Sequence, residues 1–243
     1  MERGSARGRV RRGFRRWFRP LLLVVATAFF VALYQSWIRI PANIAPWGDV
    51  ELDRPPGWLA RMQINSLASD SAACIAALDR SQLRYRRTPV RPIRNGCGLE
   101  AAVRPLQSHI RYNRPFDISC GMMAALYWYE AELQRLAQQH LGTSIARIDQ
   151  LGTYACRNVN SADTGRRSQH ATANAIDIAG FRLADGRTIS ILKDWGRETP
   201  QGHFLADARD EACRFFNVVL SPNYNQLHAN HFHLDLGGFR MCR

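Results

Sequence analysis

Two short stretches carry the pattern that decides the fold: Ser168-Gln169-His170-Ala171-Thr172-Ala173-Asn174-Ala175-Ile176-Asp177 and His228-Ala229-Asn230-His231-Phe232-His233. Only seven histidines occur in 243 residues, and four of them lie here. Two imidazoles and one carboxylate are a common ligand set for a catalytic zinc ion that keeps its fourth position open for water. An isolated H-x-H pattern is more often an ordinary pair of strand histidines. The additional His/Asp pair in an Ala-rich, strand-like setting favours metal binding.

The expected site follows from the alternation of side chains along strands. Ala175 and Asp177 share one face of a predicted strand, and His231, His233 and Asp235 share one face of the last strand. His170 lies in the loop that enters the first strand and can fold back over it. If the strands are adjacent, Asp177 and His233 meet. The predicted zinc ligands are therefore His170, Asp177 and His233, with His228 or Asp235 as the next candidates.

A family resemblance starts at these residues. Ser168-x-His170, Ala175-x-Asp177 and His231-x-His233 resemble the S-x-H…A-x-D…H-x-H pattern of the zinc D-Ala-D-Ala carboxypeptidases and endopeptidases. The wider group includes the lysostaphin-type enzymes and the hedgehog fold. The chain is more closely similar to the bacterial extensin-like C-terminal domain family, over roughly residues 45 to 243. That similarity also includes Tyr154-Ala155-Cys156-Arg157, Ala184-Asp185-Gly186-Arg187, Ala212-Cys213-Arg214 and Cys242-Arg243. The resemblance implies a small sheet carrying a zinc site, and by analogy with the wider group, hydrolysis of a peptide bond.

The sequence offers weaker evidence for the residues that would act as the base or contact the oxyanion. The carboxypeptidase relatives often carry an acidic residue three positions before the last ligand, whereas here that residue is Asn230, which cannot act as a base. His231 is the better candidate for the base that accepts a proton from water. Arg157 and Arg166 are candidates for contact with an oxyanion or a substrate carboxylate, and the alternative for both is a loop-surface arginine. Ser168 either orients the loop or is a plain turn serine.

The order of elements indicates an α+β fold with a small antiparallel sheet and flanking helices. Apolar residues at three- and four-residue spacing predict a helix from Ser119 to Gly142. Shorter helices are expected from Asp70 to about Leu78 and from Phe204 to Phe216. The expected strands cover residues 145–154, 174–181, 188–192, 218–220 and 231–236.

The first 40 residues have the composition of a membrane anchor. Residues 1–19 hold eight arginines and one glutamate, and so contribute +7 of the formal net charge of +13. An apolar run follows, so we expect a cytoplasmic tail at 1–19 and one transmembrane helix at 20–39. A cleaved signal peptide is the competing interpretation. Residues 40–69 contain four prolines and are expected to be a linker or a packed lead-in before the domain at 70–243, with Trp47 and Trp58 suggesting that parts of it pack on the domain.

Six cysteines lie downstream of this segment, and none forms a C-x-x-C pair. An even number without metal-type spacing favours disulfides in an oxidising compartment over a cysteine zinc site. Three bridges allow fifteen connectivities, and the spacing does not choose among them. Reduced, buried cysteines are the alternative.

Together these patterns predict an inner-membrane protein with a single span and a C-terminal zinc (Zn2+) domain in the periplasm. The resemblance implies that this domain is a peptidase acting on peptidoglycan peptides, at a bond that involves a D-amino acid. The alternatives are a non-catalytic protein that binds or scaffolds the cell wall, and a structural zinc domain. A nucleic-acid partner is not expected, because the positive charge is concentrated before residue 20 and no basic-aromatic motif occurs.

Overall fold

Helix α4 (Cys120–Leu141) is the longest helix in the computed structural model, which describes residues 18, 20–29, 31–32, 35 and 49–243. The side chain of Ser119 accepts the backbone N–H of Met122 and begins the helix. Gly142 ends it in a left-handed conformation with φ 68°, which glycine adopts without steric cost. The predicted helix between Ser119 and Gly142 is confirmed, with most of its residues buried in the core.

A seven-stranded sheet lies against this helix, with strand order β12-β10-β11-β8-β7-β5 and β9 paired to β8. The central pairs β7–β8, β8–β11 and β10–β11 are antiparallel, as predicted, while the outer pairs β5–β7 and β10–β12 are parallel. The strands are β5 (Arg111–Tyr112), β7 (Ile145–Gly152), β8 (Ala175–Leu183), β9 (Thr188–Ser190), β10 (Val218–Leu220), β11 (Phe232–Asp235) and β12 (Met241–Cys242). The α+β class with a small, largely antiparallel sheet is thereby confirmed.

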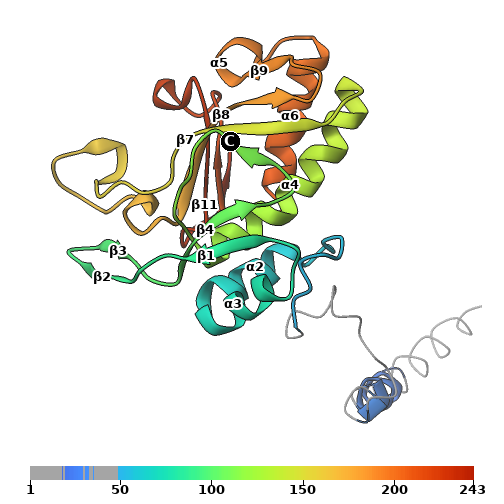
Figure 1. Ribbon diagram of the computed structural model, residues 1–243. Coiled ribbons are helices and arrows are strands. Elements are labelled where there is room, and N and C mark those ends of the chain that lie inside the picture. The colour runs from blue at the N-terminus through green and yellow to red at the C-terminus, as the bar shows by residue number, and fades with distance from the viewer. Residues whose placement is uncertain (1–17, 19, 30, 33–34, 36–48) are drawn as a thin grey trace, which may run out of the picture. The chain divides into compact units, whose positions relative to one another are not determined.

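One face of the sheet is covered by α4 and α6 (Pro200–Ala212), which run side by side in Figure 1. Tyr129 of α4 donates its hydroxyl to the carbonyl of Ala208 in α6. Phe181 of β8 packs edge-on against Phe204 of α6, with 5.3 Å between ring centroids. These contacts form one core, so the apolar side chains of the strands face the helices and their polar side chains face away.

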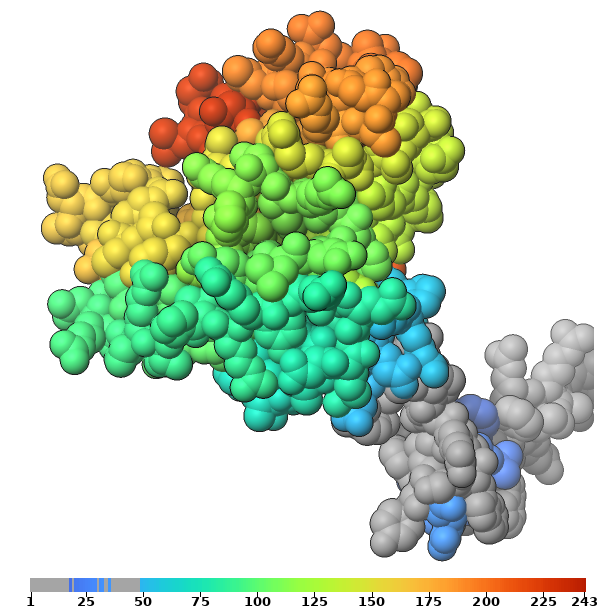
Figure 2. Space-filling view, viewed as in Figure 1, coloured from blue at the N-terminus to red at the C-terminus, as the bar shows by residue number. Residues whose placement is uncertain are grey.

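The remaining elements lie around this core. A three-stranded sheet has the order β1-β4-β6, and β2 pairs with β3. The elements are α2 (Ala60–Ser69), α3 (Ser71–Asp79), β1 (Arg84–Arg87), β2 (Arg91–Arg94), β3 (Cys97–Leu99), β4 (Ala102–Gln107), β6 (Ile118–Ser119), α5 (Ile191–Asp194) and the 3-10 turns η1 (Val159–Ser161), η2 (Gln169–Thr172) and η3 (Gln226–His228). The loop of residues 156–167 projects from the body as the yellow-to-gold segment of Figures 1 and 2.

Residues 60–69 belong to the stretch 40–69, for which a linker or a packed lead-in is expected. These residues form α2, whose Ile64 and Leu67 are buried in the same core as α4. Arg61 also donates to the carbonyl of Cys213, far away in the sequence. The prolines that suggested a linker precede the helix, and tertiary packing stabilises a segment whose own pattern is weak.

Helix α6 begins four residues before the predicted Phe204. Thr199 accepts the backbone N–H of Gly202, and Pro200 occupies the first turn. A capping threonine followed by proline is a start signal for a helix, because proline lacks the N–H that is unsatisfied there. The Thr-Pro pair was the signal for this boundary.

Three disulfides join the six cysteines in the pairs Cys74–Cys120, Cys97–Cys156 and Cys213–Cys242, and none is free. The first joins α3 to the start of α4. The second joins β3 to the projecting loop, and the third joins the end of α6 to β12. The predicted number of bridges is confirmed, and the structure supplies their connectivity.

The chain forms two compact units, residues 1–41 and 42–243. In the first unit, residues 20–29 and 31–32 are helical. Among the described residues, no helix has both the length and the hydropathy needed to cross a membrane. The predicted tail at 1–19 and anchor at 20–39 fall partly outside the described residues, so the topology stays a prediction.

We expect the removal of a disulfide to destabilise the second unit according to the length of chain it closes. Cys97→Ser/Cys156→Ser opens a separation of 59 residues, and Cys213→Ser/Cys242→Ser one of 29 residues. Each should lower the free energy of unfolding by about 2–4 kcal/mol, with the larger loss for the longer loop. Urea unfolding of both variants measures which of them loses more free energy of unfolding. Six reactive thiols in the denatured, unreduced wild-type chain would contradict the assigned bridges.

Candidate metal centre

The pairing of β8 with β11 brings two of the predicted ligands face to face. Asp177 and His233 are direct partners in the register of these antiparallel strands. Directly opposite residues project to the same face with their Cβ atoms about 4.5–5.5 Å apart. The Nδ1 atom of His233 consequently lies 2.9 Å from Oδ1 of Asp177.

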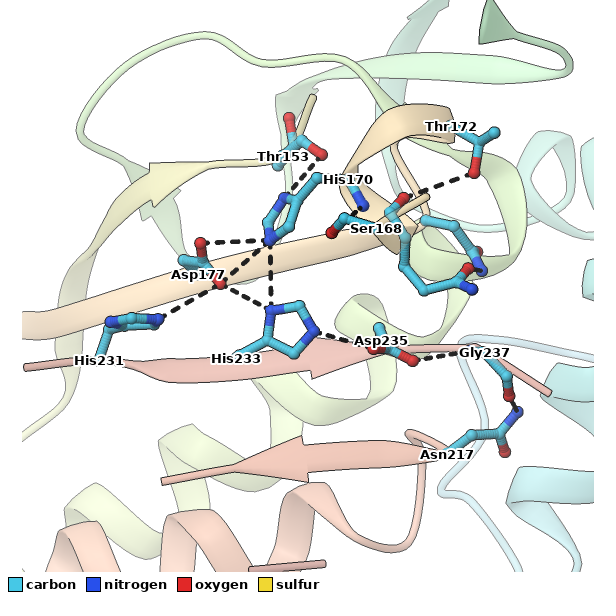
Figure 3. Close-up of polar contacts among 12 residues, drawn as sticks. Thr153, Ser168, His170, Thr172, Asp177, Asn217, His231, His233, Asp235 and Gly237 are labelled. Carbon is cyan, nitrogen blue, oxygen red and sulfur yellow. Dashed lines mark hydrogen bonds and ion pairs between the residues drawn. The ribbon is translucent and has the colours of Figure 1, made fainter. Parts of the chain in front are cut away.

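The third predicted ligand comes from the turn that precedes β8. Ser168 caps the turn η2 by accepting the backbone N–H of His170, so its side chain orients this turn. The imidazole of His170 is folded over the strand, with Nε2 3.3 Å from Oδ1 of Asp177 and 3.2 Å from Nδ1 of His233. Figure 3 shows the three side chains converging on one point. The structure therefore brings His170, Asp177 and His233 together.

The spacing of these atoms fits a small divalent cation. A tetrahedral zinc ion with ligands at roughly 2.0–2.1 Å separates its ligand atoms by about 3.3 Å. The measured separations of 2.9, 3.2 and 3.3 Å among the three ligand atoms are close to that value. Each residue offers one ligand atom, and the set is partly accessible at Asp177 and His233. The donor set of two imidazole nitrogens and one carboxylate suits zinc.

Two further groups hold the imidazoles in the orientation that a metal requires. Nδ1 of His170 lies 3.1 Å from the carbonyl oxygen of Thr153, which can only accept, so Nε2 is left free to bind. Nε2 of His233 lies 2.8 Å from Oδ2 of Asp235, whose other oxygen accepts the backbone N–H of Gly237. A metal-binding histidine commonly donates its second nitrogen in this way. The role of Asp235 was available from the alternation His231, His233, Asp235, but a backbone carbonyl such as that of Thr153 has no sequence signal.

The electrostatics of the metal-free cluster favour an ion pair. Burial raises the pKa of Asp177, but hydrogen bonds from His170 and His233 outweigh it and hold that pKa well below its usual range. Burial lowers the pKa of His233, but hydrogen bonds to Asp177 and Asp235 outweigh it and raise the pKa to about 9. At neutral pH His233 is therefore protonated without metal, and a cation must displace that proton.

Two other histidines stand beside this cluster as neutral imidazoles. Burial, together with the charges of His231 and His233, lowers the pKa of His228 to about 4. Burial also lowers the pKa of His231. The rings of His228 and His231 are 5.1 Å apart, and Nε2 of His231 is 3.7 Å from Oδ1 of Asp177.

Asn230, the residue at the position where the resemblance implied an acid, contacts the ring of His231. Its Oδ1 atom lies 2.8 Å from Nδ1 of His231. An amide oxygen can only accept, so Nδ1 carries the proton and Nε2 of His231 keeps its lone pair on the side of Asp177. His228 is held in the same way, with Nδ1 2.7 Å from Oδ1 of Asn225.

Arg157 and Arg166 line a cleft of about 180 Å³ together with His170, His228 and His233. Arg157 donates to the hydroxyl of Ser161. Arg166 lies over the ring of Phe239, with its guanidinium carbon 5.3 Å from the centroid. Within the part of the chain that is described, neither guanidinium contacts the three predicted ligands. Both therefore stand at the edge of the site rather than at its centre.

Residues 72–243 match a family model described as Extensin-like protein C-terminus. No significant match to a curated protein or to a solved structure was found.

We expect one zinc ion per chain, held by the three converging side chains. His170→Ala, Asp177→Ala and His233→Ala should each lose the ion, and Asp235→Asn should weaken binding by about 10–100-fold because it frees the ring of His233. His203→Ala, which removes an exposed histidine paired with Glu198, is the matched control and should keep the metal. Elemental analysis and competition with a chelator measure both effects. Full zinc retention in all three alanine variants would contradict the assignment.

Metal binding should also depend on pH through His233. Its raised pKa means that zinc affinity falls as the pH decreases below about 9, because each binding event displaces a proton. The stability of the metal-free chain has the opposite pH dependence and decreases as the pH rises. The raised pKa of His233 contributes stability that is fully present below an unfolded pKa of about 6.5 and is lost as the pH rises through about 9.

Calorimetry in buffers of different ionisation enthalpy measures the proton released near pH 7. Asp235→Asn removes one of the two carboxylates that raise the pKa of His233. The variant should therefore release a smaller fraction of a proton when zinc binds. Zinc affinity that does not change between pH 6.5 and 9 would exclude this coupling.

Proposed function

The chain belongs to the extensin-like C-terminal family, and we propose from its His170–Asp177–His233 cluster that it is a zinc-dependent peptidase of peptidoglycan peptides. The observation that carries this proposal is the convergence of three ligand atoms at one point, with a neutral imidazole beside them. A structural zinc site is usually closed by four protein ligands and is rich in cysteine. Here all six cysteines are in disulfides, which favours a catalytic over a structural ion.

Zinc bound by these residues would act as a Lewis acid and lower the pKa of water towards neutrality. His231 is the base in this proposal. Its Nε2 atom takes a proton from the attacking water, whose oxygen adds to the carbonyl carbon of the peptide. The same imidazole then gives the proton to the leaving nitrogen as the C–N bond breaks, as a general acid–base does. Asn230 fixes the tautomer that this exchange needs.

In this proposal Arg157 and Arg166 bind the substrate or the oxyanion. A guanidinium at the edge of a cleft binds a carboxylate or a developing oxyanion with charge-assisted hydrogen bonds. The cleft between these arginines and the histidines is small, at about 180 Å³, which suits the end of a peptide rather than a folded protein. This is the basis for a bond near a chain end, such as one that involves a D-amino acid.

The location proposed for this chemistry is the periplasm. Three disulfides favour an oxidising compartment. The apolar run after the arginine-rich residues 1–19 continues beyond Ala26-Thr27-Ala28, which favours an uncleaved inner-membrane anchor over a cleaved signal peptide. A reporter fused after Arg243 should be active in the periplasm. Recovery of a mature chain that begins near Phe29 would replace the anchor with a cleaved signal peptide.

We expect His231→Ala to keep zinc and to lose about 100-fold or more in turnover, the usual scale for a lost acid–base group. The measurement is mass spectrometry of muropeptides incubated with the full-length chain at matched zinc occupancy. His203→Ala is the control for removal of an exposed histidine and should retain activity. Equal turnover by wild type and His231→Ala would remove His231 as the base.

Asn230→Asp supplies the carboxylate that relatives carry, now beside Nδ1 of His231. It should raise the pKa of His231 and move the acid limb of the pH–rate profile to higher pH. If the wild-type chain binds muropeptides but turns over none of them, the chain is instead a non-catalytic cell-wall binding protein.

A further inference from the structure

A second, larger groove lies along the sheet edge at β5, and its lining is strongly basic. Its volume is about 1220 Å³, and the residues that line it include Arg86, Arg104, Arg111 and Arg114 but no aspartate or glutamate. The green segment that carries most of this lining lies on the face shown in Figure 2. We call this hollow the arginine groove.

Two carboxylates that bond to residues lining the arginine groove are already engaged. Asp117 binds Arg104 through two hydrogen bonds of 2.7 and 2.6 Å, and so neutralises one of the four arginines. Glu130 is fully buried and accepts hydrogen bonds from Ser108, Tyr112 and the backbone of Ile110. Neither acid lines the groove, and neither forms an ion pair with Arg86, Arg111 or Arg114.

Three guanidinium groups are consequently available to a ligand. Arg86 and Arg111 are exposed, and the guanidinium groups of their side chains form no hydrogen bond or ion pair with any described residue. Arg114 donates to the carbonyl of Leu151, which leaves its other donors free. Arginine presents a planar set of donors that matches a carboxylate in a bidentate way. Several unpaired arginines in one hollow therefore indicate a ligand with several carboxylates.

Strand β7 runs from the arginine groove, which Ile145 and Ala146 line, to the metal cluster. Arg114 contacts Leu151, and the next residue, Gly152, is the direct partner of Asp177 in the β7–β8 register. A Cβ atom added at Gly152 would meet nothing within 4 Å, so there is open space at Gly152 itself. At the other end, Arg111 pairs with Arg147, five residues before Gly152 along β7. At about 3.3 Å per residue the two ends are roughly 17 Å apart, the length of about five extended residues.

We propose that the arginine groove binds the carboxylates of an acidic peptide whose scissile bond lies at the metal cluster. This inference rests on the proposed function and specifies its substrate as a peptide with free carboxylates on one side of the bond. A hollow about five residues long beside the outermost strand of the sheet suits an extended peptide better than a flat membrane surface. Open space at Gly152 lets that peptide pass from the groove to the cluster.

The test is binding by the metal-free, full-length chain, in which the peptide is not hydrolysed. The probes are a peptidoglycan stem tetrapeptide with free carboxylates and the same peptide with these groups amidated. Wild type should bind the free-acid peptide more tightly. Arg86→Gln/Arg111→Gln should weaken this binding roughly tenfold at low ionic strength, and added salt should shrink the difference. Arg86→Lys/Arg111→Lys, which keeps both charges, should restore part of it.

Lys193→Gln/Arg197→Gln is the matched control, because it removes two exposed charges outside the groove. It should bind as wild type does. Equal affinity of wild type and Arg86→Gln/Arg111→Gln for the free-acid peptide would overturn the proposal, as would equal affinity for the amidated peptide. Binding only to anionic lipid vesicles would also overturn it.

A separate substitution tests the passage at Gly152. Gly152→Phe places a ring at the position that pairs with Asp177, so it should raise KM for the tetrapeptide at unchanged zinc content. Leu192→Phe, which places a ring at an exposed site outside both hollows, is the control and should leave KM unchanged. Turnover separates this inference from the proposed function. Peptide binding through the arginines without any cleavage would refute the peptidase and leave the arginine groove standing. Cleavage that ignores both the arginines and the amidation would refute the arginine groove and leave the peptidase standing.

Discussion

The contact between Asp177 and His233 across β8 and β11 is the constraint on which the rest of the site depends. A slip of one residue in this register would turn every side chain of a strand to the other face. The apolar residues of the same strands, such as Ile176, Ile178 and Phe232, are fully buried against the helices and hold the register in place. The hydrophobic core thus determines which polar side chains meet on the opposite face.

Burying the Asp177 carboxylate on the polar face of the sheet is unfavourable, and the neighbouring side chains of the cluster offset that cost. A carboxylate as buried as Asp177 is destabilised by loss of hydration unless charge and hydrogen bonds surround it. Here His170 and His233 supply both, and Thr153 and Asp235 hold the far side of each ring. The same contacts that make the metal-free cluster tolerable also aim a nitrogen of each ring and an oxygen of Asp177 at one point. Preorganisation for a cation and stability without it have one structural origin.

The surroundings of the cluster divide the work between two hollows. On one side is the small cleft with Arg157 and Arg166, part of whose wall is the projecting loop that Cys97–Cys156 joins to β3. On the other side of β7 is the arginine groove. The projecting loop carries Arg157 and Arg166, whereas strands β1, β4 and β5 carry Arg86, Arg104 and Arg111 of the groove. In the proposed function, the strands thus position part of the substrate contact as well as Asp177 and His233.

The sequence alone predicted those features that depend on interactions between residues close together in the chain. Ser119 and Gly142 mark the ends of α4, alternation marks β8 and β11, and the histidine spacing singled out the residues that converge. The even number of cysteines predicted three disulfides. The sequence could not predict which cysteines pair, because pairing depends on which segments pack together. Helix α2, the carbonyl of Thr153, the orienting role of Asn230 and the uncompensated arginines of the groove were likewise decided by tertiary structure. Each arises from contacts between residues far apart in the chain, which no local periodicity encodes.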